Sequence, residues 1–273
     1  MLVVRSIGPV KVFKMGRDLL PGKAYYFTAA YLVDHLLIDT GSPRQKHEFL
    51  KALENTPIHT VVNTHSHEDH IGANCALSKR GVEIKAHPKA LPILRNPALL
   101  NMGLYRRFFW GVPEPSDGSP VDEKLETENF SFQVIEVPGH SPDHIALYEQ
   151  SEGWLFCGDA YVGGKDRAYR KVYRPKQIIE SLEKMASLEI SYLFPGSGTI
   201  YKDGQERIKA KLEHLTELRD TILELYRQGL PPKVIARKVV GREPFITWLT
   251  FGDFSALNLV ECFLRDFVSE SLA

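Results

Sequence analysis

The chain has few cysteines, no net charge and no long apolar segment. Its three cysteines, Cys75, Cys157 and Cys262, are far apart and form no C-x-x-C pair, which suits buried thiols in a reducing compartment. Basic and acidic residues number 34 each, so the strongly basic body that grips nucleic acid by counterion release is not indicated. No run approaches a membrane span, and the N-terminus has no apolar signal core. We expect a cytoplasmic protein without a membrane partner.

The length and composition bound the architecture. The chain has 273 residues, of which 43% are apolar and 25% are charged. This allows one large domain, or one domain with a small appendage. A chain of this size buries a sizeable core without disulfides or structural metal. Any bound metal is therefore expected to be functional and not a folding device.

Strands and helices alternate along the first two hundred residues. Extended apolar runs between Ala24 and Asp39 are followed by a helical pattern from Pro43 to Asn55, and further strand and helix patterns succeed them. Residues 101–123 look irregular. From about Gly204 the sequence becomes amphipathic and helical. We predict a layered α/β domain over residues 1–203 and a C-terminal helical extension over residues 204–273.

The segment HSHEDH collects three imidazoles and two carboxylates in six residues. His65 and His67 are two apart at the end of a strand, and alternate side chains of an extended backbone point the same way. Asp69 and His70 lie where the following helix begins, so they can point at a second position beside the first. Imidazole and carboxylate suit zinc, iron or manganese. The segment therefore predicts a metal site.

Two further candidate ligands lie at the ends of later strands. His140 ends a strand pattern in VPGHSPDH, and Asp159 ends another in WLFCGDA. An α/β architecture places functional residues at strand ends and in the loops on one rim. We expect both residues to join the metal site.

Five short pieces, taken in order, resemble the metallo-β-lactamase superfamily of hydrolases. They are LLIDTG at Leu36 to Gly41, THSHEDH at Thr64 to His70, PGH at Pro138 to His140, GD at Gly158 and Asp159, and PGSG at Pro195 to Gly198. The resemblance spans roughly residues 20 to 200. It implies an αββα metallo-β-lactamase-like sandwich, with metals at one rim of the two sheets.

The resemblance also implies a ligand set for two neighbouring ions. It assigns His65, His67 and His140 to the first ion, Asp69 and His70 to the second, and Asp159 to a position that bridges the two. Asp39 would lie behind these ligands and orient them; the alternative is a turn or helix-capping aspartate. The implied cofactor is one or two divalent ions. Zinc is expected, with iron and manganese as alternatives.

The last piece departs from the family pattern. The family usually ends with a histidine ligand in a PGH-like turn, whereas this chain has PGSG with Ser197 at that position. A hydroxyl replaces imidazole poorly, so Ser197 would be a weak ligand of the second ion. The protein then either binds that ion weakly or works with one ion. His35, His87 or His144 could substitute, although hydrogen bonding is the expected role of His144.

The resemblance predicts an enzyme that uses a metal-bound hydroxide. A metal lowers the pKa of its bound water to about 7, and Asp69 could orient that group and carry a proton to the leaving group. The predicted substrate is a small ester, thioester, lactone or phosphodiester. Three alternatives stay open: a mono-iron oxygenase similar to persulfide dioxygenases, a non-catalytic metal-binding protein, and a ribonuclease-like hydrolase of nucleic acid.

Two segments rich in arginine and aromatic residues are candidates for a substrate pocket. They contribute Tyr105, Arg106, Arg107 and Trp110 from LYRRFFW, and Arg167, Tyr169, Arg170 and Tyr173 from KDRAYRKVYR. Aromatic walls with cations suit an acidic or aromatic small molecule. The alternative is a solvated basic loop beside aromatics that cap the core. The C-terminal helices could form a lid, a homodimer surface or, less in keeping with the neutral charge, a guide for nucleic acid.

Overall fold

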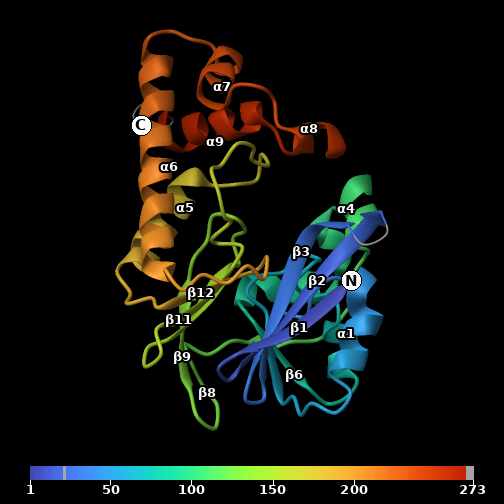
Figure 1. Ribbon diagram of the computed structural model, residues 1–273. Coiled ribbons are helices and arrows are strands. Elements are labelled where there is room, and N and C mark those ends of the chain that lie inside the picture. The colour runs from blue at the N-terminus through green and yellow to red at the C-terminus, as the bar shows by residue number, and fades with distance from the viewer. Residues whose placement is uncertain (21–22, 269–273) are drawn as a thin grey trace. The chain divides into compact units, whose positions relative to one another are not determined.

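The computed structural model describes residues 1–20 and 23–268 (Figure 1). These residues form two compact units. The first consists of residues 1–136, 143–162 and 190–204, and the second of residues 137–142, 163–189 and the chain from 205 onward. The second unit thus includes two segments from before residue 204, and the predicted domain boundary there stays a prediction.

The first unit contains two mixed β-sheets. Among the described residues, the larger sheet has seven strands in chain order: β1 (Leu2–Ile7), β2 (Val10–Leu20), β3 (Lys23–Val33), β4 (Leu36–Ile38), β5 (Thr60–Val62), β6 (Glu83–Ala86) and β7 (Ser119–Pro120). Neighbours from β1 to β4 are antiparallel, and neighbours from β4 to β7 are parallel. The carboxyl ends of β4 and β5 therefore meet at one edge of this sheet.

The smaller sheet has the strand order β12-β11-β10-β9-β8 (Figure 1). Its strands are β8 (Lys124–Glu126), β9 (Ser131–Glu136), β10 (Ile145–Glu149), β11 (Trp154–Gly158) and β12 (Tyr192–Pro195). Neighbours from β8 to β11 are antiparallel, whereas β11 and β12 are parallel. Residues that follow β11 and β12 consequently emerge at a shared edge.

The alternation of side chains on β3 explains how the two sheets share a core. Tyr31 and Val33 pack with Phe156 and Phe194 of the smaller sheet, whereas Leu32, which lies between them in sequence, packs on the opposite face. Successive side chains of a strand point to opposite faces, so one strand of alternating large apolar residues serves two cores. The rings of Phe156 and Phe194 stack at 4.5 Å inside the inter-sheet core.

Short helices cover the outer face of the larger sheet. They are α1 (Lys46–Ala52), α2 (Asn74–Ser78), α3 (Leu91–Arg95) and α4 (Leu104–Phe109), with single turns η1 (Pro43–Gln45), η2 (Pro88–Ala90) and η3 (Pro97–Leu100). Phe49 of α1 meets the ring of Phe13 edge-on at 5.3 Å. Helix α4 and strand β7 both lie within residues 101–123. Most of this segment is irregular, as predicted, but the prediction missed both elements because each is too short to show a clear period.

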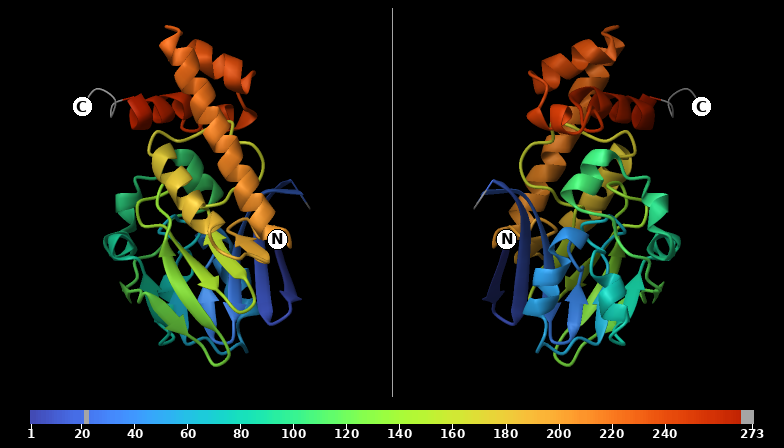
Figure 2. Two further views of the ribbon diagram at one scale, coloured as in Figure 1. Left: turned by 90° about the vertical axis from the view of Figure 1, so that its left-hand side faces the viewer. Right: turned by 90° about the vertical axis from the view of Figure 1, so that its right-hand side faces the viewer.

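The second unit is helical. It contains α5 (Pro175–Ala186), α6 (Gly204–Arg227), α7 (Pro232–Val240), α8 (Phe245–Leu249) and α9 (Ala256–Val268). Gly204, the first residue of α6, is counted with the first unit. Helix α9 packs against α5 and α7 (Figure 2), and its Leu259 and Phe263 are fully buried. The predicted C-terminal helices are confirmed. In the described part of the chain, no helix has both the length and the apolar character that a bilayer crossing needs.

Candidate metal centre

Residues that follow parallel strands build the centre of the first unit. Asp39 comes after β4, and His65 follows β5 by three residues. In the smaller sheet, Asp159 comes directly after β11 and Gly196 after β12. The carboxyl ends of parallel strands lie at one edge of a sheet, which is where α/β proteins commonly bind ligands.

Three of the predicted ligands come together at this edge. One ligand atom each of His65, His70 and Asp159 lie within 4.8 Å of one another. The His70 Nε2 atom is 3.6 Å from an Asp159 carboxylate oxygen and 3.9 Å from one of Asp69. The His65 Nε2 atom is 3.0 Å from Nδ1 of His67. Two imidazoles with carboxylates are a donor set that fits a divalent transition-metal ion.

Asp39 holds His70 from behind. One Asp39 oxygen lies 2.7 Å from His70 Nδ1, and the carboxylate also accepts from the Thr64 backbone N–H at 2.7 Å and from the Thr64 hydroxyl at 2.8 Å. Because Nδ1 is engaged, Nε2 faces the other ligands. A carboxylate behind a metal-binding imidazole fixes its orientation and raises its basicity. The contacts fix the His70 ring, and the role of Asp39 in orienting a metal ligand stays a prediction.

The backbone of the HSHEDH loop is also held in place. The Ser66 N–H donates to the Asp143 carboxylate at 2.9 Å, and the Thr28 hydroxyl donates to the Asp69 carbonyl at 2.8 Å. The His70 carbonyl accepts from the Asn63 side chain at 3.1 Å. Buried polar groups that are satisfied in this way fix a single loop conformation. The sequence carried no signal for these partners.

Glu68, another residue of the loop, forms a buried ion pair with Arg106 of α4. Arg106 Nε donates to one Glu68 oxygen at 2.8 Å, and Nη2 donates to the other. Both side chains are almost fully buried. Arg106 was predicted as a substrate-pocket residue; the structure gives its guanidinium a partner within the metal loop.

Charge at the centre favours a cation. Burial lowers the pKa of His70, but the carboxylates of Asp39, Asp69 and Asp159 outweigh burial and raise that pKa well above its usual value. The pKa of the Asp69 carboxyl is raised to about 7, chiefly by burial; Glu68 and Asp159 contribute to the rise, while His70 opposes it. Several carboxylates close together in a desolvated site repel one another unless a proton or a cation joins them.

A family model described as the metallo-beta-lactamase superfamily matches residues 26–197. The chain belongs to this superfamily. It is a hydrolase-like member, and the predicted resemblance to the superfamily is confirmed at that level. The match covers β4, β5, β11 and β12, the strands that carry the centre.

Curated relatives agree with this assignment. A "Beta-lactamase-like protein 2 homolog" from Caenorhabditis elegans is 25% identical over 240 residues, which are 84% of this chain and 73% of the relative. A hydroxyacylglutathione hydrolase from Vibrio campbellii is 29% identical over 203 residues, 71% of this chain and 70% of the relative. These are similarities to named proteins and leave the substrate of this superfamily member open.

The solved structures show the same fold. A metallo-beta-lactamase family protein from Thermus thermophilus has a TM-score of 0.70 and 19% identity, over 97% of this chain and 95% of that chain. The predicted fold class, a metallo-β-lactamase sandwich with C-terminal helices, is confirmed. The fold does not identify the reaction by itself.

His144 and Ser197 have different surroundings in this superfamily member. The His144 Nε2 atom accepts from the Asp159 backbone N–H at 3.1 Å, and its ring stacks on His65 at 4.5 Å. Burial lowers its pKa to about 4, so this imidazole is neutral. The predicted hydrogen-bonding role of His144 is confirmed.

The Ser197 hydroxyl accepts from the Thr199 N–H at 3.4 Å, and its role as a weak ligand stays a prediction.

Gly196 brings the last turn against the centre. A Cβ atom added to Gly196 would lie 2.3 Å from an Asp159 carboxylate oxygen and 2.8 Å from His70 Cε1. The Gly196 N–H donates to the Gly158 carbonyl at 2.8 Å. Only glycine lets the backbone approach these ligands so closely. Gly196 is therefore the residue of the PGSG piece that this close approach requires.

His140 belongs to the second unit. It lies in the segment 137–142, and its ring centroid is 4.9 Å from that of Tyr173. Its assignment to the first ion rests on the superfamily pattern and stays a prediction. Of the proposed substitutes, His87 has its Nε2 atom 3.2 Å from a Glu136 carboxylate oxygen, and His35 lies at the opposite end of β4 from Asp39, with its ring tilted against that of His59.

The basic segment of the second unit has partners inside that unit. Arg167 donates to the carbonyls of Val240 and Arg242, and Arg170 forms a 2.9 Å ion pair with Asp253. Tyr169 is buried. The ring of Tyr169 lies 6.2 Å from that of Phe263 and 5.3 Å from that of Tyr173. These side chains join the segment to the C-terminal helices. A part for them in a substrate pocket stays a prediction.

The remaining pocket candidates lie on or beside α4. Arg107 is exposed, and its Nε donates to the Met102 carbonyl at 3.2 Å. Trp110 is half-buried, with its ring 6.4 Å from that of Tyr26. Tyr105 is partly exposed. Their contact with a substrate stays a prediction.

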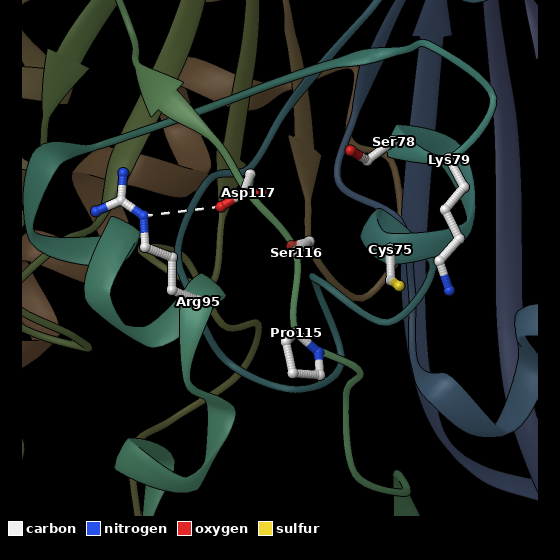
Figure 3. Close-up of a pocket in the computed structure, with 7 residues that line it drawn as sticks. All are labelled: Cys75, Ser78, Lys79, Arg95, Pro115, Ser116 and Asp117. Carbon is white, nitrogen blue, oxygen red and sulfur yellow. Dashed lines mark ion pairs between the residues drawn. The ribbon is translucent and has the colours of Figure 1, made fainter.

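A separate pocket of about 240 Å³ lies beside α2 and α3 (Figure 3). Its lining includes Cys75, Lys79, Arg95 and Asp117, and Figure 3 shows Arg95 turned toward Asp117. The pocket contains no candidate ligand of the metal centre. None of the residues predicted from the sequence as site residues lines it.

Proposed function

We propose that this hydrolase cleaves a thioester of a small molecule with one or two divalent ions, zinc being the expected metal. The observation that supports it is the cluster of His65, His70 and Asp159, with His70 oriented by Asp39. The relative from Vibrio campbellii, named a hydroxyacylglutathione hydrolase, acts on a thioester. That match covers 71% of this chain and 70% of the relative.

The donor set fits such an ion. His70 and Asp69 would hold one ion together with Asp159, and the superfamily pattern assigns His65, His67 and His140 to the other, with Asp159 shared. When bound, a divalent ion polarises the substrate carbonyl and lowers the pKa of a water molecule to about 7. The protein orients the ligands, because hydrogen bonds hold the backbone of the HSHEDH loop, which carries four of them.

Asp69 is the proposed proton carrier. Its carboxylate lies 3.9 Å from His70 Nε2, at the edge of the centre, and its carbonyl is fixed by Thr28. In a thioester the leaving group is a thiolate, whose conjugate thiol has a pKa of about 8.5. Such a group needs less help from an acid than the alkoxide of an oxygen ester. One carboxyl that orients water and returns a proton is therefore enough.

Metal analysis tests the cofactor. Protein purified without added metal should contain zinc, and a chelator should abolish hydrolysis that zinc then restores. Two zinc ions per chain would support full occupancy of both positions. One tightly bound iron, with oxygen consumed in the presence of a persulfide, would overturn the proposal in favour of the mono-iron oxygenase.

Hydrolysis of a matched thioester and oxygen ester with the same acyl group tests the substrate class. We expect the thioester to be the better substrate, and His67→Ala to abolish its turnover. His47→Ala, which removes an exposed histidine from α1, is the control and should retain activity. Turnover that persists in His67→Ala would show that the centre is wrongly assigned. A cytoplasmic location and a homodimer through the C-terminal helices stay predictions.

A further inference from the structure

We infer that Arg17, together with Arg44 and the aromatic end of α4, binds an anionic group of the substrate, such as a carboxylate, remote from the bond that is cleaved. The inference rests on the proposed function for its substrate, a small thioester. All of the residues involved belong to the first unit. They lie outside the candidate ligand set, and no motif in the sequence singled out Arg17 or Arg44.

Arg17 lies at a β-bulge or irregularity in the pairing of β2 with β3. The register of β2 against β3 shifts between Gly16 and Asp18, which leaves Arg17 at the irregularity. Bulges redirect a side chain and are frequent beside active sites. The Arg17 guanidinium lies 4.1 Å from the ring centroid of Phe108 and 5.8 Å from that of Phe109. The aromatic end of α4 thus supports the flat face of the guanidinium and leaves its edge for hydrogen bonds.

One nitrogen of the Arg17 guanidinium lacks a hydrogen-bond partner within the described residues. This atom, Nη1, is buried. Burial lowers the pKa of Arg17, and the nearby Arg44 lowers it further. Arg44 itself donates to the Arg107 carbonyl, at 3.4 Å. Two guanidinium groups that repel each other make a site that an anion would stabilise.

Helix α4 links this cationic site to the metal centre. Arg106 pairs with Glu68, which lies between His67 and Asp69. Phe108 and Phe109 follow Arg106 on α4 and lie within one turn of it; one helical turn is about 5 Å along the axis. The anion site is therefore built on the same short helix that is fixed to the metal loop. A substrate with its carboxylate several bonds from the scissile carbonyl suits this arrangement, and such remote contacts can contribute to transition-state binding.

A matched pair of substrates tests the inference. The two probes are benzoyl thioesters of 3-mercaptopropionate, which is anionic, and of 3-mercaptopropionamide, which is neutral. We expect the wild-type protein to prefer the anionic thioester in kcat/KM by roughly tenfold, and Arg17→Met to reduce that ratio to about one. Arg17→Lys should keep part of the preference because it keeps the charge. Added salt should lower the wild-type ratio.

A second arginine provides the control. Arg80 is exposed after α2, so Arg80→Met removes the same charge from the protein and should leave the preference for the anionic thioester unchanged. If the wild-type protein does not distinguish the two thioesters, or if Arg17→Met distinguishes them as well as the wild type, the inference is wrong. Loss of the preference in Arg80→Met would also overturn it, because the protein's overall charge would then explain the effect.

Binding of uncleavable analogues separates this inference from the proposed function. The probes are the thioethers that correspond to the two thioesters, titrated by calorimetry into the metal-loaded protein. Tighter binding of the anionic thioether that is lost in Arg17→Met supports the inference even if neither thioester is hydrolysed, a result that would overturn the proposed function alone. Equal binding of both thioethers to the wild-type protein overturns the inference, whatever the hydrolysis assay shows.

Discussion

Arg106 and Glu68, a residue of the metal loop, form a bidentate ion pair, with the two side chains 7% and 2% exposed. Glu68 lies between two predicted ligands, His67 and Asp69, and Arg106 comes from α4. The pair therefore fixes both the loop and the helix. A bidentate arginine–carboxylate pair also sets orientation, because the planar fork accepts one arrangement.

Breaking this pair should destabilise the protein strongly. Arg106→Met leaves the Glu68 carboxylate buried without its partner, and we expect the free energy of unfolding to fall by about 3 kcal/mol or more. The double variant Glu68→Met with Arg106→Met removes both charges and should recover part of this loss. Urea unfolding measures both effects. The control is Arg95→Met, which loses only an exposed pair with Asp117 and should change stability by less than about 1 kcal/mol.

Asp39→Asn should weaken the metal centre without unfolding the chain. The amide keeps the size of the side chain but no longer presents a negative oxygen to His70 Nδ1, so we expect metal affinity to fall by roughly 10- to 100-fold. Titration against a competing chelator measures this loss. Asp34→Asn is the matched control, because Asp34 also has a positive φ but its carboxylate accepts from Asn129. Equal affinity of Asp39→Asn and the wild type would contradict the orienting role.

The metal-free protein should become less stable as the pH rises. The pKa of Asp69 in the folded state is raised from 3.8 to about 7, chiefly by burial. The folded protein therefore holds a proton that the unfolded chain has released, and this stabilising contribution is lost as the pH rises toward 7. His70, with its raised pKa, adds a loss of the same sign at higher pH. Urea unfolding in the presence of chelator measures the slope.

Two comparisons test that interpretation of the pH dependence. Asp69→Asn should flatten the part of the slope below about pH 7, because the amide does not titrate. Saturating zinc should make the wild-type protein more stable as the pH rises, since the ion binds the ionised carboxylate and releases its proton. A metal-free slope that is unchanged in Asp69→Asn would show that other groups cause it.

Gly196→Ala should displace a metal ligand. The new methyl group would lie 2.3 Å from the Asp159 carboxylate, so that carboxylate or the turn must move, and we expect metal affinity to fall by at least about tenfold. Gly103→Ala is the control, because its nearest contact would be an ordinary 3.6 Å to Tyr105. Unchanged metal binding in Gly196→Ala would mean that Asp159 does not hold the ion.

The order of elements and part of the centre could be predicted because their signals are local. His65, His67, Asp69 and His70 are within six residues of one another, and Asp159 ends a continuous apolar strand. Apolar runs and turn residues locate strand ends, and parallel strands bring those ends to one edge. The short helix α4 was missed because one and a half turns carry little periodicity.

The sequence by itself determined which side chains are available to bind a metal and which strands they follow. Only the tertiary structure decided how they are held: Asp39 behind His70, Arg106 paired with Glu68, and Arg17 over Phe108. The partners in these pairs are far apart in the chain. Strand register, a bulge and the packing of one short helix bring them together, and local sequence patterns do not encode such long-range choices.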